Sequence, residues 1–456
     1  MLVLILTKMA IGYIITRYEQ IKKVVMAKIE KEKAINLFEN VLQSKYLAVM
    51  SLLFGFLCWA LEWTALVVCG EALIFILILL FSKDVKNIFA PFFFISFFIP
   101  DIRTMTNYLV YYIAVGLALL TLIGVFIYKC VKDRKTITFG RFYKGLLASF
   151  VAYLMAGIFN SFYIVNSLMI LGFCVGIFIF YFLAVNYTKN ISEYFEELFI
   201  LSGIIIGLQI FFNYVINGPG SIYFSAQGLN TASLFVVLGI IACFTRAMKS
   251  KRDYIYFIIV LVLTVFVVVS KSRAGMILTA VVDVAFTIYT FIKSKNKTYM
   301  LLVFGAFLLI IAIMLLTSEF LREEIQKLVF GKKFGFSGRE ELWAWSIDRF
   351  LEAPIFGYGF FYMDKIPSLR EGTHVILAHN TLLQWLTSTG IVGTLIMVVY
   401  YLNKYTILFK KFNREKLFAL LSVLALELSG LVDQAANMDI FVVSISIMLV
   451  ASVERK

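Results

Sequence analysis

Charged residues are scarce in this sequence. Only 15% of its 456 residues are Asp, Glu, Lys or Arg, whereas 61% are hydrophobic and 16% are aromatic. A soluble globular domain carries roughly 25% charged residues. The composition therefore excludes a soluble globular protein.

Cysteine and histidine are also rare, with five and two residues. The cysteines fall in or at the edges of apolar segments, so we expect small core residues rather than disulfides. His374 and His379 lack the spacing to carboxylates that is typical of a metal ligand set. The sequence also lacks a phosphate-binding glycine loop followed by Lys and Ser or Thr. We predict no metal, no cofactor and no ATP-driven pump.

Long apolar runs dominate what is present. A spanning helix needs roughly 20 apolar residues to cross a bilayer core about 30 Å thick. We predict an all-α polytopic membrane protein with a bundle of about 14 transmembrane helices, within a range of 13 to 15. The expected spans are residues 46–61, 63–81, 87–99, 108–128, 143–160, 163–184, 197–216, 229–245, 254–270, 274–292, 299–317, 380–402, 417–433 and 439–453.

The distribution of basic residues predicts the orientation. If Lys45 is cytoplasmic, alternate connections carry 30 of the 42 Lys and Arg residues, against 11 on the opposite side. Such charges accumulate in short cytoplasmic loops because they resist translocation. The net charge of +14 therefore indicates topology rather than a nucleic-acid partner. We expect a multi-pass protein with a cytoplasmic C-terminus.

Four regions follow from this pattern. Residues 1–45 combine a hydrophobic segment with a basic juxtamembrane helix, residues 46–317 form the main helix bundle, and residues 380–456 form the C-terminal spans. Residues 318–379 form one long extracytoplasmic loop with short helices, a length typical of functional loops. Residues 1–16 are either a short extra span or an interfacial helix. The basic helix after them either lies on an anionic leaflet or is solvated.

Within the long loop, Ser337 and Glu340 have the capping-box spacing that starts a helix. This places Arg339 in the first helical turn, where a bound anion would offset its conflict with the helix dipole. Phosphate suits such a position. The spacing equally allows Arg339 to pair with Glu340 or Glu341.

Lys271 and Arg273 lie in a very short turn between two predicted spans. Two cations that are separated by one residue at the start of a helix can hold a diphosphate. The planar guanidinium of arginine gives bidentate bonds to phosphate oxygens. The alternative is that these side chains extend to lipid headgroups.

His379 lies where the long loop re-enters the membrane. Asn380 or Thr381 can cap the following span, and Thr381 with Gln384 again has capping-box spacing. Imidazole titrates near neutral pH, so His379 is a candidate general base. A structural role is the alternative, and His374 has the weaker functional claim.

Three carboxylates lie inside predicted spans, namely Glu71, Asp283 and Glu427. Charged groups are costly in hydrocarbon and normally face partners in the bundle interior. They can form a proton relay, although a hydrogen-bonded packing role is favoured.

The order of several short motifs resembles the O-antigen polymerase and ligase superfamily, over roughly residues 255–402. The motifs are Ser270-Lys271-Ser272-Arg273, Ser337-Gly338-Arg339 with Trp343 or Trp345 after it, Ala353-Pro354-Ile355-Phe356-Gly357-Tyr358-Gly359, and His379-Asn380 with Gly390-Ile391-Val392-Gly393. Their order and shared external placement make the combination more specific than any one motif.

The resemblance implies a membrane glycosyltransferase at the outer face of the bacterial cytoplasmic membrane. Its donor would be a polyprenyl-diphosphate-linked saccharide and its acceptor a glycan. In the family, arginines at the positions of Arg273 and Arg339 engage the donor diphosphate, and the histidine matching His379 activates the acceptor hydroxyl. Lys271, Ser337 and Asn380 belong to the same motifs, and we expect them to line the same substrate-binding site.

The preferred activity is polymerisation of lipid-linked repeat units into a surface polysaccharide, either O-antigen or capsule. The first alternative is ligase-type transfer of the glycan to a surface acceptor. An alternative from another class is a flippase or secondary transporter that uses the intramembrane carboxylates. For the enzyme, the resemblance also implies a flippase and a chain-length regulator as neighbours.

Overall fold

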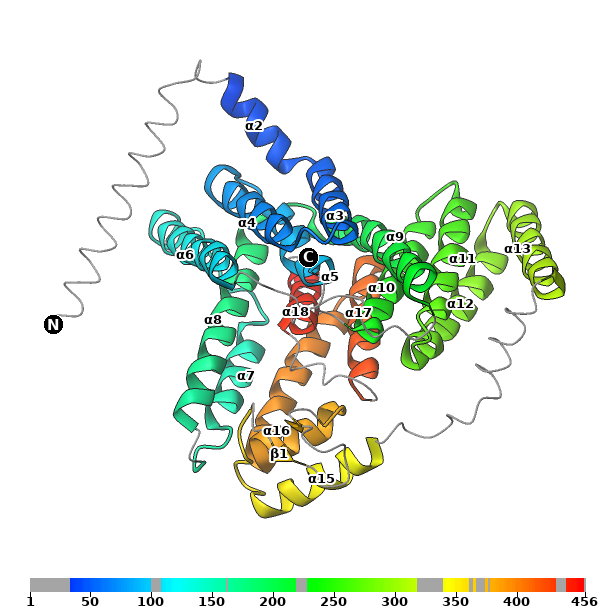
Figure 1. Ribbon diagram of the computed structural model, residues 1–456. Coiled ribbons are helices and arrows are strands. Elements are labelled where there is room, and N and C mark those ends of the chain that lie inside the picture. The colour runs from blue at the N-terminus through cyan, green and yellow to red at the C-terminus, as the bar shows by residue number, and fades with distance from the viewer. Residues whose placement is uncertain are drawn as a thin grey trace.

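The computed structural model describes residues 33–99, 108–160, 163–218, 228–317, 339–360, 364–365, 374–375, 378–431 and 440–454. Residues 1–16 and Ser337, which carry predictions made above, lie outside the described residues. Helices make up most of the described chain and pack side by side as a bundle (Figure 1).

Each of the 14 predicted spans coincides with a helix. In chain order the elements are α2 (Lys33–Gln43), α3 (Lys45–Ala60), α4 (Thr64–Phe81), the 3-10 helix η1 (Lys86–Ile88), α5 (Phe89–Phe98), α6 (Tyr108–Lys132), α7 (Tyr143–Met155), α8 (Tyr163–Tyr187), α9 (Ile191–Asn217), α10 (Leu229–Ala247), α11 (Asp253–Val269), α12 (Arg273–Lys293), α13 (Lys297–Thr317), α15 (Arg339–Glu352), β1 (Asp364–Lys365), β2 (His374–Val375), α16 (Thr381–Phe409), α17 (Arg414–Gly430) and α18 (Ile440–Glu454).

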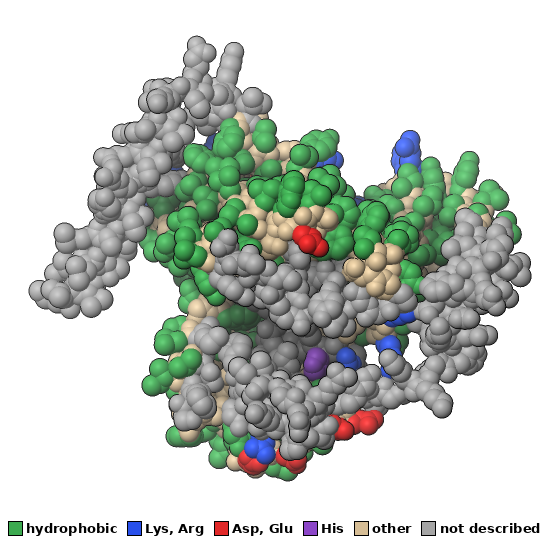
Figure 2. Space-filling model, in the orientation of Figure 1, with side chains coloured by type: hydrophobic (Ala, Val, Ile, Leu, Met, Phe, Trp, Pro, Cys, Tyr) green, Lys and Arg blue, Asp and Glu red, His purple; other side chains and the backbone are tan. Residues whose placement is uncertain are grey.

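The helices have the surface of a membrane protein. Seven of them are long and apolar enough to cross a bilayer, and six shorter helices are apolar as well. Large hydrophobic side chains stay exposed on the outside of the bundle, for example Leu109 at 71% and Leu120 at 68% on α6. Green apolar side chains accordingly cover the upper part of Figure 2. Exposed apolar patches of this extent mark a surface that contacts lipid or protein, which supports the predicted class of helical membrane protein.

Some boundaries differ from the predictions. The predicted start at 197 is late, because α9 begins at Ile191 and its first turns carry glutamates that pair with arginines of α10 and α17. The predicted end at 160 is also wrong, because Gly157 adopts a φ of 64° and turns the chain after α7. The all-helical prediction misses one antiparallel pair in the loop, in which Lys365 of β1 faces His374 of β2.

Phenylalanines form the centre of the bundle. Phe89, Phe93, Phe94 and Phe97 are fully buried on η1–α5. They contact buried rings of α9 and α10, such as Phe235, whose ring centroid is 4.7 Å from that of Phe97 in an edge-on arrangement. Edge-to-face packing of this kind adds about 0.5 to 1.5 kcal/mol per pair to the burial of the rings. The core therefore fixes these three helices against one another.

One end of the bundle, which we call the basic end, gathers ion pairs. The buried carboxylate of Glu196 on α9 lies 2.8 Å from both Arg246 Nε on α10 and Arg414 NH1 on α17. Arg414 also donates to the carbonyl of Thr245 at 2.8 Å. The start of α9, the end of α10 and the start of α17 therefore lie together.

The opposite end, which we call the loop end, holds the segment between α15 and α16. Gly157, just after α7, donates its backbone N–H to Phe356 O at 2.7 Å. Thr381 at the start of α16 donates its hydroxyl to Gly430 O, at the end of α17, at 2.9 Å. These contacts place the end of α7, the start of α16 and the end of α17 at this end of the bundle.

Candidate active site

Arg273 is the first residue of α12, and the turn before it is well defined. Lys271 has a left-handed φ of 56°, and Ser272 is the N-cap, with its Oγ accepting from Gly275 N at 3.3 Å. The Ser272 side chain is buried, whereas Lys271 and Arg273 are exposed. The turn therefore presents two cations beside the free N–H groups of a helix start, an arrangement suited to anions.

The start of α16 repeats this design. His379 has a φ of 49°, and Asn380 is the N-cap, with its Oδ1 accepting from Leu383 N at 3.0 Å. Of the two caps that the sequence allows, Asn380 is confirmed, whereas the Thr381 and Gln384 side chains bond to Gly430 O and Ala378 N and form no capping box. Non-glycine residues with positive φ are uncommon and cluster at functional sites. Lys271 and His379 are both of this kind.

The two helix starts lie at the same end of the bundle. Asn380 Nδ2 donates to Leu431 O at 2.9 Å, which joins α16 to the end of α17. Helix α17 packs against α10, and the contacts at the basic end make the two antiparallel, so the start of α10 is near the end of α17. A Cβ on Gly275 of α12 would lie 2.6 Å from Ser233 Oγ in the first turns of α10. The starts of α12 and α16 therefore both belong to the loop end.

Arg339 begins α15, as the sequence predicts, and its side chain is half-buried. Helix α15 packs on α16, where Thr387 Oγ1 donates to Ser346 O at 3.0 Å, and it crosses the loop end in Figure 1. Figure 2 shows a histidine beside Lys and Arg side chains in a hollow of this face. Arg273, Arg339 and His379 thus all come from elements of the loop end.

Helix α16 is broken at Gly390, which has a φ of 62° and a ψ of −166°. In an unbroken helix, Ile391 and Val392 would donate to carbonyls four residues earlier. Instead Ile391 N donates to Pro354 O at 2.8 Å and Val392 N to Ile355 O at 3.2 Å. At the break, two backbone N–H groups of α16 therefore donate to a separate segment of the chain.

That segment, residues 353–360, we call the strap. It also satisfies the carbonyls that the break leaves free. Tyr358 N donates to Thr387 O at 2.8 Å, and Gly359 N donates to Ser388 O at 2.9 Å. Buried backbone groups outside regular helices require such partners. The two glycine-containing motifs at 353–359 and 390–393 therefore form one unit.

Glycine is required at two positions of this unit. A Cβ on Gly390 would lie 2.3 Å from Ile355 O, and a Cβ on Gly357 would lie 2.5 Å from the carbonyl carbon of Ser388. Both residues also have positive φ, at 62° and 66°. An L side chain is strained by both the conformation and the contact.

Replacing Gly390 with alanine should lower the free energy of unfolding by about 2 kcal/mol or more, because the strap must separate from α16. The measurement is the thermal unfolding of the purified protein in detergent. Gly305→Ala in α13 is a matched control, since no atom lies within 4 Å of its Cβ position. Equal stability of the two variants would contradict this account of the break.

The intramembrane carboxylates bond to separate partners. Glu71 accepts from Ser51 Oγ at 2.7 Å between α3 and α4. Asp283 accepts from Thr264 Oγ1 at 2.7 Å between α11 and α12. Glu427 on α17 forms an ion pair with Lys404 on α16. These contacts fit the predicted packing role.

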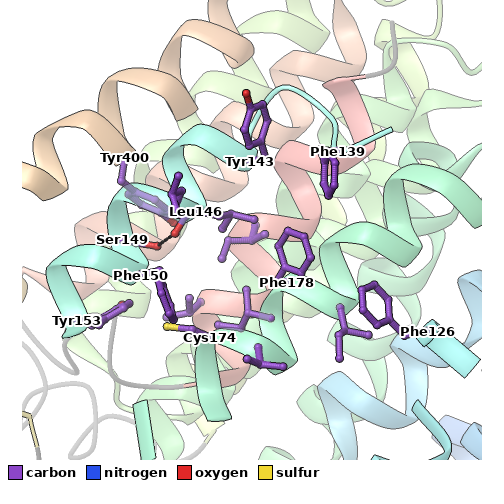
Figure 3. A pocket seen from close by; sticks show the side chains of 16 residues that line it. Phe126, Phe139, Tyr143, Leu146, Ser149, Phe150, Tyr153, Cys174, Phe178 and Tyr400 are labelled. Carbon is purple, nitrogen blue, oxygen red and sulfur yellow. Dashed lines mark hydrogen bonds between the residues drawn. The ribbon is translucent and has the colours of Figure 1, made fainter. Parts of the chain in front are cut away.

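An apolar cavity of about 390 Å³ lies among α6, α7, α8, α16 and α18 (Figure 3). It extends along α7 from Tyr143 to Tyr153, and Phe150 and Phe178 point into it. The ring of Tyr153 is 5.3 Å from that of Trp385, on the first turns of α16 after His379. The cavity thus extends along α7 toward the first turns of α16.

Within the described part of the chain, no three His, Cys, Asp or Glu side chains gather closely enough to hold a metal ion. The sequence analysis did not single out Ser388, and it gave Gln384 only a capping role. Gln384 accepts from Ala378 N and donates to Ser388 Oγ. Their spacing of four residues on one helix face was the available signal.

A known protein family matches the part of the chain that contains the candidate active site. Residues 257–398 match the family model described as O-antigen ligase. This confirms the resemblance to the O-antigen polymerase and ligase superfamily. A search of curated proteins finds no match to the chain. The matched segment runs from α11 to α16, and it includes Arg273, Arg339, the strap and His379.

Proposed function

We propose that this protein is a membrane glycosyltransferase that polymerises polyprenyl-diphosphate-linked oligosaccharide units at the outer face of the cytoplasmic membrane. The observation that carries the proposal is the common location of Arg273, Arg339 and His379 at the loop end, within the segment that matches the O-antigen ligase family. In this account the 14 predicted spans cross the membrane, with the loop end outside and the C-terminus inside.

Arg273 and Arg339 bind the diphosphate of the donor. Each guanidinium offers a planar pair of donors that matches phosphate oxygens, and each lies at a helix start where backbone N–H groups favour anions. Lys271 adds charge, while Ser337 and Asn380 line the same site. The positive groups offset the negative charge that develops on the leaving diphosphate, which is usually a large contribution to catalysis.

His379 accepts the proton of the acceptor sugar hydroxyl. The hydroxyl oxygen forms a bond to the anomeric carbon of the donor as the bond from that carbon to the diphosphate oxygen breaks. The electron pair of the broken bond leaves with the polyprenyl diphosphate. General-base assistance of this kind contributes roughly 10² to 10⁴ in rate.

The hydrocarbon tail of the donor lies between helices, and the cavity beside α7 has a suitable lining. It is lined mainly by aromatic and aliphatic side chains, and its Tyr153 end contacts α16. A polyprenyl tail is already surrounded by hydrocarbon in the bilayer, so van der Waals packing against this lining would hold it there. A flippase that delivers the donor and a chain-length regulator are the expected partners.

A ligase-type reaction is the second candidate, and the description of the matching family favours it. The helices before residue 257, outside the matched segment, favour polymerase. Purified protein in liposomes with a lipid-diphosphate-linked repeat unit tests the proposal. We expect a ladder of products on the polyprenyl carrier. Transfer to another anchor would indicate a ligase, and flux without any new glycosidic bond would indicate a transporter and contradict the proposal.

A further inference from the structure

Gln384 is a buried polar side chain, 6% exposed, in the first turns of α16. Its Oε1 accepts from Ala378 N at 2.7 Å, and its Nε2 donates to Ser388 Oγ at 2.9 Å. The amide therefore uses both of its polar atoms to connect the chain before α16 with a residue one turn further along.

The first partner fixes the turn that carries His379. Ala378 directly precedes His379 and is 1% exposed. On the other side, Asn380 caps α16 and donates to Leu431 O at 2.9 Å. The left-handed His379, with a φ of 49°, is thus held between two anchored neighbours. A strained conformation persists when its surroundings determine it in this way.

The second partner belongs to the break in α16. Ser388 also accepts, through its backbone carbonyl, from Gly359 N of the strap at 2.9 Å. The strap follows α15, which begins with Arg339. A continuous series of hydrogen bonds therefore runs from the strap through Ser388 and Gln384 to the His379 turn.

We infer that Gln384 is a positioning residue that orients His379 relative to the diphosphate site. The inference rests on the proposed function. A displacement of about 1 Å from productive geometry can lower a rate by about 10²-fold. Without the amide, Ala378 N–H is left buried without its partner, which favours rearrangement of the turn.

Replacing Gln384 with leucine should lower kcat about 10- to 100-fold, with KM for the donor within about twofold. Gln384→Glu should restore most of the lost activity, because a carboxylate can accept from both Ala378 N and the Ser388 hydroxyl. If the leucine variant fails to fold, Gln384→Asn replaces it, since its shorter side chain cannot reach both partners. Full kcat in the folded leucine or asparagine variant would overturn the inference.

A double variant separates positioning from general stability. In a His379→Ala background, Gln384→Leu should cause no further loss of rate, because its effect passes through the imidazole. A further loss of tenfold would overturn the inference. Gln209→Leu is the matched control: Gln209 is also buried and donates to Phe97 O at 3.2 Å, so its loss should affect unfolding but not kcat.

The outcomes also distinguish this inference from the proposed function. Full activity of the single His379→Ala variant would show that His379 is not the general base. Loss of activity in His379→Ala together with full activity in Gln384→Leu would reject the positioning role of Gln384 and leave the role of His379 intact.

Discussion

Replacing His379 with alanine should lower the rate of glycosyl transfer by about 10²- to 10⁴-fold, because the acceptor hydroxyl loses its general base. The fold should persist, since the N-cap of α16 is Asn380 and not His379. The measurement is the initial rate of product formation by purified protein with a lipid-linked donor, with thermal unfolding recorded in parallel.

Two further variants make this result specific. His379→Asn keeps a residue type that tolerates the left-handed conformation but lacks imidazole, so it should be as inactive as the alanine variant. His374→Ala removes the other histidine, at the β1–β2 pair, and should retain activity. If the histidine at 374 proves essential and the one at 379 dispensable, the assignment is wrong by one site.

Arg339→Ala should lower the transfer rate about 10²- to 10³-fold, because the leaving diphosphate loses a preorganised positive group. Arg273→Ala should have an effect of the same order. Lysine at either position should restore part of the rate, since it keeps the charge but not the bidentate geometry. Initial rates over a range of donor concentrations measure these effects.

Arg349→Ala is the matched control for Arg339, because Arg349 lies on the same helix. Its guanidinium pairs with Glu352 at 2.7 Å, three residues along α15. Arg349 is partly buried and its guanidinium also lies 6.0 Å from the ring centroid of Tyr358 in the strap, so this variant should lose about 1 kcal/mol of stability but keep near-normal kcat. Equal losses for Arg349→Ala and Arg339→Ala would indicate damage to α15 instead of loss of a diphosphate ligand.

Local signals in the sequence were sufficient to predict where most helices lie. Apolar runs identified all 14 segments, although polar residues were too readily taken as boundaries, as at Glu196 in α9, whose charge is satisfied by two arginines. The Ser-x-x-Glu spacing correctly placed Arg339 in the first turn of α15. These features depend on residues within a few positions of each other, which a single sequence displays.

The break in α16 could not be predicted in this way. The bonds between the strap and residues 387–392 join positions 29 to 37 apart in the chain. They are made by backbone groups, which every residue type carries, so the sequence gives no sign of them. Gly357 and Gly390 were visible in the motifs, but their contact became evident only in three dimensions. The role of Gln384 was missed for the same reason, because its two partners define it.

The central claim is that Arg273, Arg339 and His379 face one polyprenyl-diphosphate-linked sugar. Site-specific photocrosslinking tests it most directly, with a benzophenone amino acid placed in turn beside these residues, at positions 274, 340 and 382, and a radiolabelled lipid-linked donor. Position 249 serves as the control, because Lys249 lies at the basic end, paired with Glu193. We predict labelling at all three site positions, suppressed by excess unlabelled donor, and background labelling at 249. Labelling confined to one of the three, or equal labelling at 249, would contradict the account.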